Sequence, residues 1–183
     1  MMNYNSMAKS IYANNVKVGW WDNKDSIDPL EKLQLVSTEI AEATEGERKD
    51  IMDDHLPHRK MGEVELADAM IRLLDFGGAY ECNYIKAGNS LNSASAFLRH
   101  SSSISGKHFA INVGLVDFAN SFMFSSSNVQ TNHQYSVCVN IIKDVSDSLG
   151  YDIFGAMEDK ISYNAIRADH KRENRAKKDG KKF

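Results

Sequence analysis

Two stretches of the chain decide its fold: EKLQLVSTEIAEA at residues 31–43 and ELADAMIRLLD at residues 65–75. In each stretch apolar residues recur every three or four positions, which predicts an α-helix with one face in the protein core. Each stretch also carries two carboxylates three positions apart, and residues with this spacing are neighbours on one helical face. The four acids are Glu39, Glu42, Glu65 and Asp68.

Four carboxylates set among apolar residues repel one another and are costly to desolvate unless a positive charge lies between them. Mg²⁺ and Mn²⁺ prefer oxygen ligands and also bind phosphate, so they are the cations that suit such a group. No histidine follows any of the four acids by three or four positions, which disfavours a di-iron site and favours an all-oxygen one. The sequence therefore predicts a metal site between two helices. Two separate, solvated acidic faces are the alternative.

The chain as a whole is predicted to be an all-α bundle of five or six helices in a single domain, residues 1–183. Asp28 before Pro29 predicts a helix start, because Asp is a good N-cap and Pro suits the first helical turn. The second of the expected helices is apolar on several sides, which predicts burial in a bundle core or a subunit interface. Residues 1–27 lack periodicity and are expected to form a partly irregular N-terminal arm. The helices are expected over residues 28–46, 62–78, 94–100, 109–124, 135–149 and 153–175.

Composition narrows the class of protein. With 183 residues, 42% of them hydrophobic and 26% charged, the chain is typical of one globular domain. Its formal net charge of −3 argues against a protein that wraps nucleic acid, and no apolar run approaches the ~20 residues that a membrane span needs. Cys82 and Cys138 form no CxxC motif, which favours a reduced, cytoplasmic setting. We therefore expect neither nucleic acid nor a membrane as a partner.

A basic face is predicted on the last helix, where Lys160, Asn164 and Arg167 follow one another at i, i+4 and i+7. Two cations and an amide on one face suit phosphate and sugar contacts, with the guanidinium forked onto phosphate oxygens. The alternative is a solvated face with ion pairs. Lys32 lies seven residues before Glu39, on the same helical face, and is placed to reach the same anion.

Two adjacent tryptophans precede the first acidic helix. Trp20 is a candidate for stacking on a nucleotide base, with Asn14 or Asn15 contacting the base edge. Burial of the indole in a core or an interface is the alternative. His55 and His58 form an HxxH pattern, but the proline between them breaks helical spacing, so we interpret them as loop histidines without a metal.

The two acidic stretches, together with KISYNAIR at residues 160–167, resemble the motifs of the MazG-type all-α nucleoside triphosphate pyrophosphohydrolases. The resemblance covers about residues 16–80 and 147–175. Residues 82–147, which separate these blocks, depart from the compact members of the family and are interpreted as a central helical insert, and residues 176–183 as a basic tail. The resemblance implies a MazG-like helical bundle that forms a homo-oligomer, either a dimer or a tetramer.

By the same resemblance, the four acids hold two or three Mg²⁺ ions, with Mn²⁺ as a substitute, against the phosphates of a nucleoside triphosphate. The implied reaction is attack of a metal-activated water on the α-phosphorus, which yields a nucleoside monophosphate and pyrophosphate. The chain resembles the phage-borne members more than the tandem-domain bacterial ones. One phage branch, MazZ, hydrolyses dGTP, and a resemblance to this branch implies a purine substrate and the cytoplasm of an infected host. An alternative of another class is a non-catalytic helical adaptor with an acidic docking face. Such a face needs neither a second carboxylate pair nor a basic helix.

Overall fold

The computed structural model describes residues 3–86 and 92–167. The secondary-structure elements within these ranges are all helices. The predicted all-α class is therefore confirmed. None of the described helices is long and apolar enough to cross a membrane. In chain order the elements are α1 (Tyr4–Lys17), the short 3-10 helix η1 (Lys24–Ser26), α2 (Pro29–Lys49), α3 (Met61–Ala79), α4 (Ser93–His100), α5 (Ile104–Phe124), α6 (Asn128–Ser148) and α7 (Ile153–Ile166).

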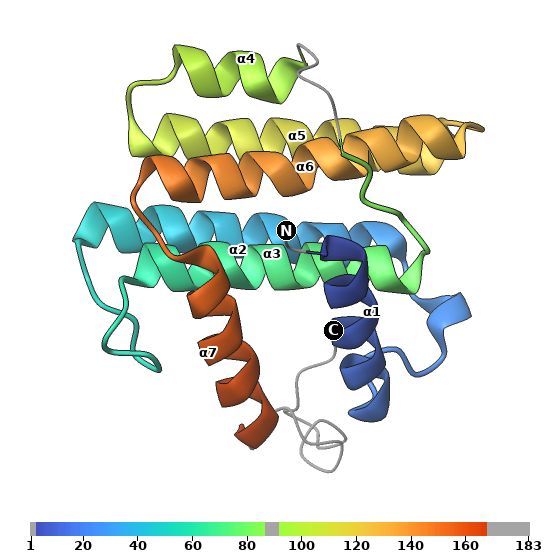
Figure 1. Cartoon of the computed structure of the whole chain (residues 1–183), viewed down its shortest axis with the longest axis horizontal. Helices are drawn as coiled ribbons and strands as arrows, with labels where there is room; N and C mark the ends of the chain where they lie inside the picture. Colours follow the sequence, from blue (N-terminus) through green and yellow to red (C-terminus); the bar gives the residue numbers. More distant parts are fainter. Residues whose placement is uncertain (1–2, 87–91, 168–183) are drawn as a thin grey trace.

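The helices are stacked in layers around α3 (Figure 1). Helices α2 and α3 form an antiparallel pair, and α5 and α6 form a second antiparallel pair that packs on the first. Helix α4 covers the outer side of α5 and α6. Helices α1 and α7 both pack on α3 and project beyond the α2–α3 pair on the side away from α4 (Figure 1). The two helices with paired acids are therefore direct neighbours, and α1 and α7 stand beside them.

Helix α2 begins where the sequence predicts. The Asp28 carboxylate accepts a hydrogen bond from the backbone N–H of Leu30 at 2.9 Å, and Pro29 occupies the first helical position. The helix continues to Lys49, somewhat past the predicted end, and two basic residues in its last turn favour this extension because they oppose the negative end of the helix dipole. The predicted apolar stripe is buried: Leu33, Val36, Ile40 and Ala43.

Helix α3 is buried on nearly all sides, as its apolar sequence predicts. The covering surfaces come from α1, α2, α6 and α7 of the same chain, so this burial needs no second subunit. Two adjacent glycines allow the close approach. A Cβ atom on Gly77 would overlap the hydroxyl of Tyr135 in α6, and one on Gly78 would lie 2.5 Å from the carbonyl oxygen of Ala8 in α1. Oligomerisation therefore stays a prediction that depends on the family resemblance alone.

The N-terminal arm is the clearest error of the sequence-based assignment, because residues 4–17 form a regular helix. The Asn3 side chain caps it by accepting from the backbone N–H of Ser6 at 3.1 Å. Ala8 and Ile11, three residues apart, are buried against the core. The buried stripe of this helix consists of these two residues alone. Because the residues around them are mostly polar, the sequence shows no clear helical period.

Three further boundaries differ from the expectation. Helices α5 and α6 begin at Ile104 and Asn128 because Ser103 and Ser127 cap them, each accepting from a backbone N–H with its side-chain oxygen. The apolar residues alone predict later starts, because the first turns of both helices, after their serine caps, are largely polar. Helix α7 ends at Ile166, and Arg167 is extended, so the expected continuation to residue 175 is wrong at this point. Ile166 is 76% exposed and offers no packing that would prolong the helix. The basic tail at 176–183 lies outside the described residues.

Candidate metal centre

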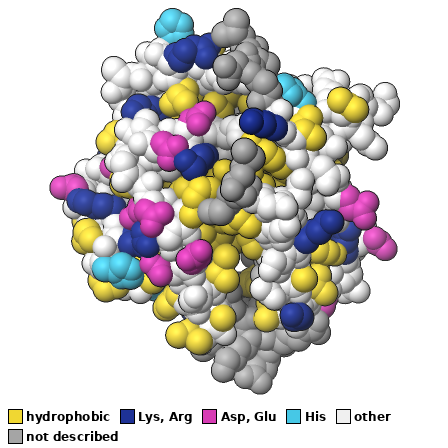
Figure 2. All heavy atoms as spheres, in the orientation of Figure 1, with side chains coloured by type: hydrophobic (Ala, Val, Ile, Leu, Met, Phe, Trp, Pro, Cys, Tyr) yellow, Lys and Arg dark blue, Asp and Glu magenta, His cyan; other side chains and the backbone are white. Residues whose placement is uncertain are grey.

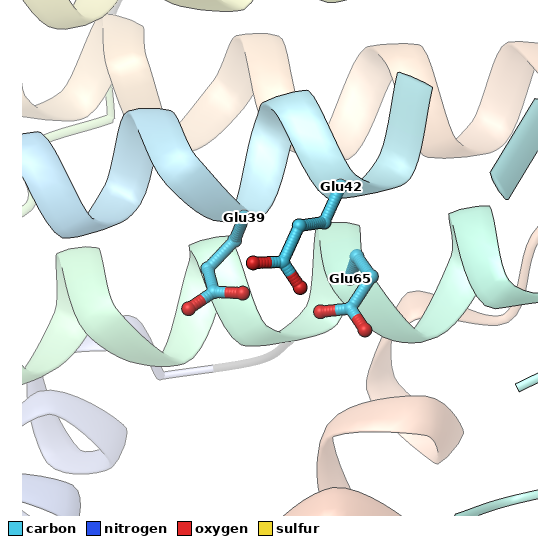
Figure 3. A group of neighbouring side chains, drawn as sticks. All are labelled: Glu39, Glu42 and Glu65. Carbon is cyan, nitrogen blue, oxygen red and sulfur yellow. The ribbon is translucent and has the colours of Figure 1, made fainter. Parts of the chain in front are cut away.

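Three of the four predicted acids converge between α2 and α3. One carboxylate oxygen from each of Glu39, Glu42 and Glu65 lies within 4.8 Å of the other two. Figure 3 shows the three side chains projecting to the same side of the helix pair, the first two from α2 and the third from α3. Glu39 and Glu65 are only 6% and 7% exposed, whereas Glu42 is exposed. Buried oxygen donors beside an exposed one suit a hard divalent cation that keeps access to solvent.

The packing of the two helices explains this convergence. Val36 and Ile40 of α2, like Leu66 and Met70 of α3, are almost completely buried in the common core. The acids stand beside these apolar residues along each helix, so the packing that buries the apolar stripes also brings the acidic stripes together. The i and i+3 spacing on α2 therefore brings both of its acids into the cluster, whereas α3 contributes Glu65 alone.

Asp68 is placed differently from the other three acids. Its Oδ2 atom lies 2.8 Å from the Nζ atom of Lys160, which belongs to α7 and is 4% exposed. A second cation is also present, because Arg72 donates from Nε to the Oε1 atom of Glu39 at 2.5 Å. Both cations come from the chain itself, and each contacts one of the predicted metal ligands.

The carboxylates are held in an environment that disfavours their negative charge. Burial raises the pKa of Glu65 to about 9; Lys160 opposes this shift, whereas Asp68 and Glu39 add to it. Burial likewise raises the pKa of Asp68, against the opposing effect of Lys160. The physical cause is the same in both cases, since several acids are desolvated together with too little positive charge between them. A divalent cation would supply the missing charge, and the all-oxygen donor set fits Mg²⁺ or Mn²⁺.

The acids line a cleft with a volume of about 1010 Å³. Its lining residues come from α2, α3, α7 and the C-terminal half of α1, as well as from the loops that precede and follow α2. Figure 1 shows that α1 and α7 stand at different places along the α2–α3 pair, on the same side of it. The surface of the molecule in this orientation mixes acidic and basic side chains with apolar atoms between them (Figure 2). Nine of the residues that the sequence singles out line this one cleft: Trp20, Lys32, Glu39, Glu42, Glu65, Asp68, Lys160, Asn164 and Arg167.

The two tryptophans have different surroundings. Trp21 is 5% exposed; its Nε1 atom donates to both carboxylate oxygens of Asp75 at 3.1 Å, and its ring meets those of Tyr12 and Tyr80 edge-on. Burial raises the pKa of Asp75 to about 6, against the opposing effect of this hydrogen bond. Trp20 is half-buried in the wall of the cleft, which Asn14 and Asn15 also line. Core packing therefore describes Trp21, although this residue also lines the cleft, and Trp20 lies half-buried in the cleft wall.

The face of α7 that carries the basic motif is turned towards the cleft. Lys160 is buried, so the alternative of a solvated face is wrong for this residue. The Oδ1 atom of Asn164 is also buried, and it has no hydrogen-bond partner among the described residues. Arg167 lies at the end of the helix with its guanidinium carbon 5.4 Å from the centre of the Tyr163 ring. A buried amide oxygen without a partner is costly, which indicates that a ligand or water belongs at this point of the cleft.

Several residues of the cleft are not predicted from the sequence to belong to the site. Arg72 and Asp75 line it from α3, and Asp53 and His55 line it from the loop between α2 and α3. The first two continue the helical stripe of Glu65 and Asp68, a signal that was available in the sequence. The histidine is an exposed loop residue, as expected, but its ring lies 4.8 Å from that of Tyr163 in α7, a contact that no local pattern predicts.

Taken together, the described residues build a cleft with clustered carboxylates on α2 and α3, an ammonium and an amide on α7, and an indole beside α1. The arrangement places oxygen donors suited to a divalent cation close to groups suited to an anion. Comparison with known proteins finds no matching family model, no matching curated protein and no matching solved structure.

Proposed function

We propose that the protein is a Mg²⁺-dependent nucleoside triphosphate pyrophosphohydrolase, an enzyme that acts on a phosphoric anhydride bond. One observation carries the proposal: the carboxylates of Glu39, Glu42 and Glu65 converge within 4.8 Å in the same cleft that Lys160 and Trp20 line. Clustered acids are common on protein surfaces, but here they share a cleft of about 1010 Å³ with groups suited to phosphate and base. The motif resemblance to the MazG-type family supports the same reaction.

The metal would be held by Glu39, Glu42 and Glu65, with Asp68 as a further ligand once Lys160 has moved away. When bound, divalent cations neutralise phosphate charge and lower the pKa of a coordinated water to make it a nucleophile. The resemblance implies two or three ions, and the four carboxylates provide enough oxygen donors for more than one. Mn²⁺ should substitute for Mg²⁺, because both prefer oxygen ligands.

The proposed reaction is the one that the family resemblance implies, and the groups around the cleft suit it. The oxygen of water forms a bond to the α-phosphorus, and the bond from that phosphorus to the bridging oxygen breaks. Pyrophosphate leaves, a nucleoside monophosphate remains, and the proton of the water passes to one of the carboxylates. Lys32 and Arg167, both in the wall of the cleft, would contact the phosphates. The Oδ1 atom of Asn164, which has no partner in the described part of the chain, would accept from a sugar hydroxyl. Trp20 would stack on the base.

The finer points of this proposal depend on the family resemblance. It favours a purine deoxynucleotide such as dGTP, a homo-oligomeric enzyme, and the cytoplasm as the place of action. A non-catalytic adaptor with an acidic docking face fits less well, because two of the three clustered acids are buried and a docking face needs exposed ones.

The test is a screen of the purified protein with each common dNTP and NTP in the presence of Mg²⁺, followed by chromatography of the products. The proposal expects equal amounts of monophosphate and pyrophosphate from at least one nucleotide, and no products after addition of EDTA. Release of a diphosphate and orthophosphate would contradict the assigned bond cleavage. A complete lack of hydrolysis across the screen would contradict the proposal that the protein is an enzyme of this class.

A further inference from the structure

Lys160 is unusual among the basic residues of the described ranges because it is buried against the acidic helices. Its side chain is 4% exposed, and its ammonium nitrogen lies 2.8 Å from Oδ2 of Asp68. The negative charges of Glu65 and Asp53 also act on it. A lysine is seldom buried without a specific partner, since desolvation of the ammonium is costly. Lys160 therefore compensates the charge of several acids at once.

This pair accounts for the position of Asp68 outside the cluster of three. The i and i+3 spacing puts Asp68 on the same face of α3 as Glu65, yet only the latter joins Glu39 and Glu42. The carboxylate of Asp68 faces the ammonium of Lys160 instead. Lys160 thus forms an ion pair with the carboxylate that would otherwise be free to join the other three acids.

We infer that Lys160 is a counter-cation built into the chain, which competes with a divalent cation for Asp68 and moves towards the bound anion when that cation binds. The inference depends on the proposed metal site and extends it, because it assigns a positioning role to one residue of α7. Lys160 and the metal cannot both take the facing oxygen of Asp68, since two cations at that distance repel each other strongly in a desolvated site.

The surroundings of Lys160 allow such a movement without displacement of the helix. The N-terminal half of α7 is anchored in the core by Ile153, Ala156 and Met157. One turn after Lys160 stands Asn164, whose buried oxygen has no partner among residues 3–86 and 92–167. A rotation of the long lysine side chain towards this amide keeps the ammonium in the cleft, where a phosphate would receive it. Metal binding and anion binding are thereby coupled through one side chain.

The first test measures the affinity for Mn²⁺, by electron paramagnetic resonance of the free ion, in the wild-type protein and in Lys160→Met. Methionine keeps most of the length and apolar area of the lysine and removes its charge. The matched control is Lys143→Met, because Lys143 pairs with Asp147 on α6 and neither lines the cleft. We expect Lys160→Met to bind Mn²⁺ about 5- to 150-fold more tightly, the usual range for coupled sites, and the control to bind as the wild type does. Equal or weaker binding by Lys160→Met would overturn the inference.

The second test uses the wild-type chain and therefore does not depend on how the variant folds. Lysines are acylated briefly with an amine-reactive ester, with and without saturating Mg²⁺, and the modified peptides are quantified by mass spectrometry. Lys160 should be protected in the metal-free protein and become several-fold more reactive with Mg²⁺, whereas Lys143 should react equally in both. Protection of Lys160 that persists while Mn²⁺ is shown to bind would overturn this inference alone. If neither the wild type nor Lys160→Met binds Mn²⁺, both this inference and the proposed function are wrong.

Discussion

The indole nitrogen of Trp21 donates to both carboxylate oxygens of Asp75, each at 3.1 Å, and so ties the segment before α2 to the middle layer of the bundle. This hydrogen bond fixes one wall of the cleft, because Trp20 directly precedes Trp21 in the chain and lies in that wall. The two tryptophans should therefore respond in opposite ways to substitution.

Trp21→Ala should mainly destabilise the fold. The indole is 5% exposed and packs edge-on against Tyr12 and Tyr80, so its removal leaves a cavity and takes one hydrogen-bond donor away from Asp75. We expect a loss of about 3–5 kcal/mol in the free energy of unfolding, as is typical of a buried aromatic residue replaced by alanine. Urea denaturation of both proteins measures this loss, and a change below about 1 kcal/mol would show that the packing of Trp21 carries little stability.

Trp20→Ala should mainly weaken substrate binding. Stacking of a base on an aromatic ring contributes ~1–3 kcal/mol, so KM for the preferred nucleotide should rise by roughly 5- to 150-fold, with a much smaller effect on the melting temperature than in Trp21→Ala. Steady-state kinetics and thermal unfolding on the same preparation separate the two effects. A large drop in Tm with an unchanged KM would assign Trp20 to the core and leave the base without a stacking partner.

A buried histidine should make stability depend on pH. The Nδ1 atom of His108 lies 2.8 Å from Oγ1 of Thr44, which itself donates to the carbonyl oxygen of Ile40, so the ring nitrogen must be the donor. The ring is 1% exposed, and burial lowers the pKa of His108 from 6.5 to about 4. The fold therefore favours the neutral ring.

Because this pKa is depressed in the folded state, the stability from the neutral ring is fully present above pH 6.5 and is lost as the pH falls towards about 4. The loss from this one group should reach about 3 kcal/mol at the acid end of that interval. Denaturant titrations between pH 7 and pH 4 on the wild type and His108→Leu measure it, since the carboxylates contribute to both proteins equally. Parallel pH profiles would contradict the assignment.

Glycine at position 77 should be required for the approach of α6 to α3. A Cβ atom there would overlap the ring and hydroxyl of Tyr135, which is 1% exposed and cannot easily move. Gly77→Ala should cost about 1–3 kcal/mol, as overpacked cores usually do. Gly114→Ala in α5 is the matched control, because its nearest neighbour would be the Cβ of Ala94 at an ordinary 3.4 Å. Equal melting temperatures of the two variants in thermal unfolding would argue against a tight contact between α3 and α6.

The sequence predicts the middle layer of the fold well because its signals are local. An Asp-Pro start, an apolar stripe and paired acids on each helix are sufficient to place α2 and α3 and to suggest that Glu39 and Glu65 face each other. Helix α1 escapes prediction because only Ala8 and Ile11 among its residues are buried, so its stabilisation comes from packing on α3 and not from its own pattern.

The arrangement of the site goes beyond what local patterns can predict. Asp68 and Lys160 belong to helices far apart in the chain, and their ion pair follows from the way α7 packs across α3. The division of roles between Trp20 and Trp21 likewise depends on the position of Asp75 in the folded chain. The sequence thus gives the residue types of the site, whereas their partners follow only from tertiary packing.

The most direct measurement is the rate of pyrophosphate release by the wild type and by Glu39→Gln, with saturating Mg²⁺ and a preferred nucleotide. Glutamine keeps the size of the side chain and removes the charge from a carboxylate that lies within 4.8 Å of those of Glu42 and Glu65. The account predicts steady release by the wild type and a loss of at least about 100-fold in the variant, because one removed metal ligand weakens the stabilisation of charge in the transition state. Release at equal rates by both proteins, or by neither, would contradict it.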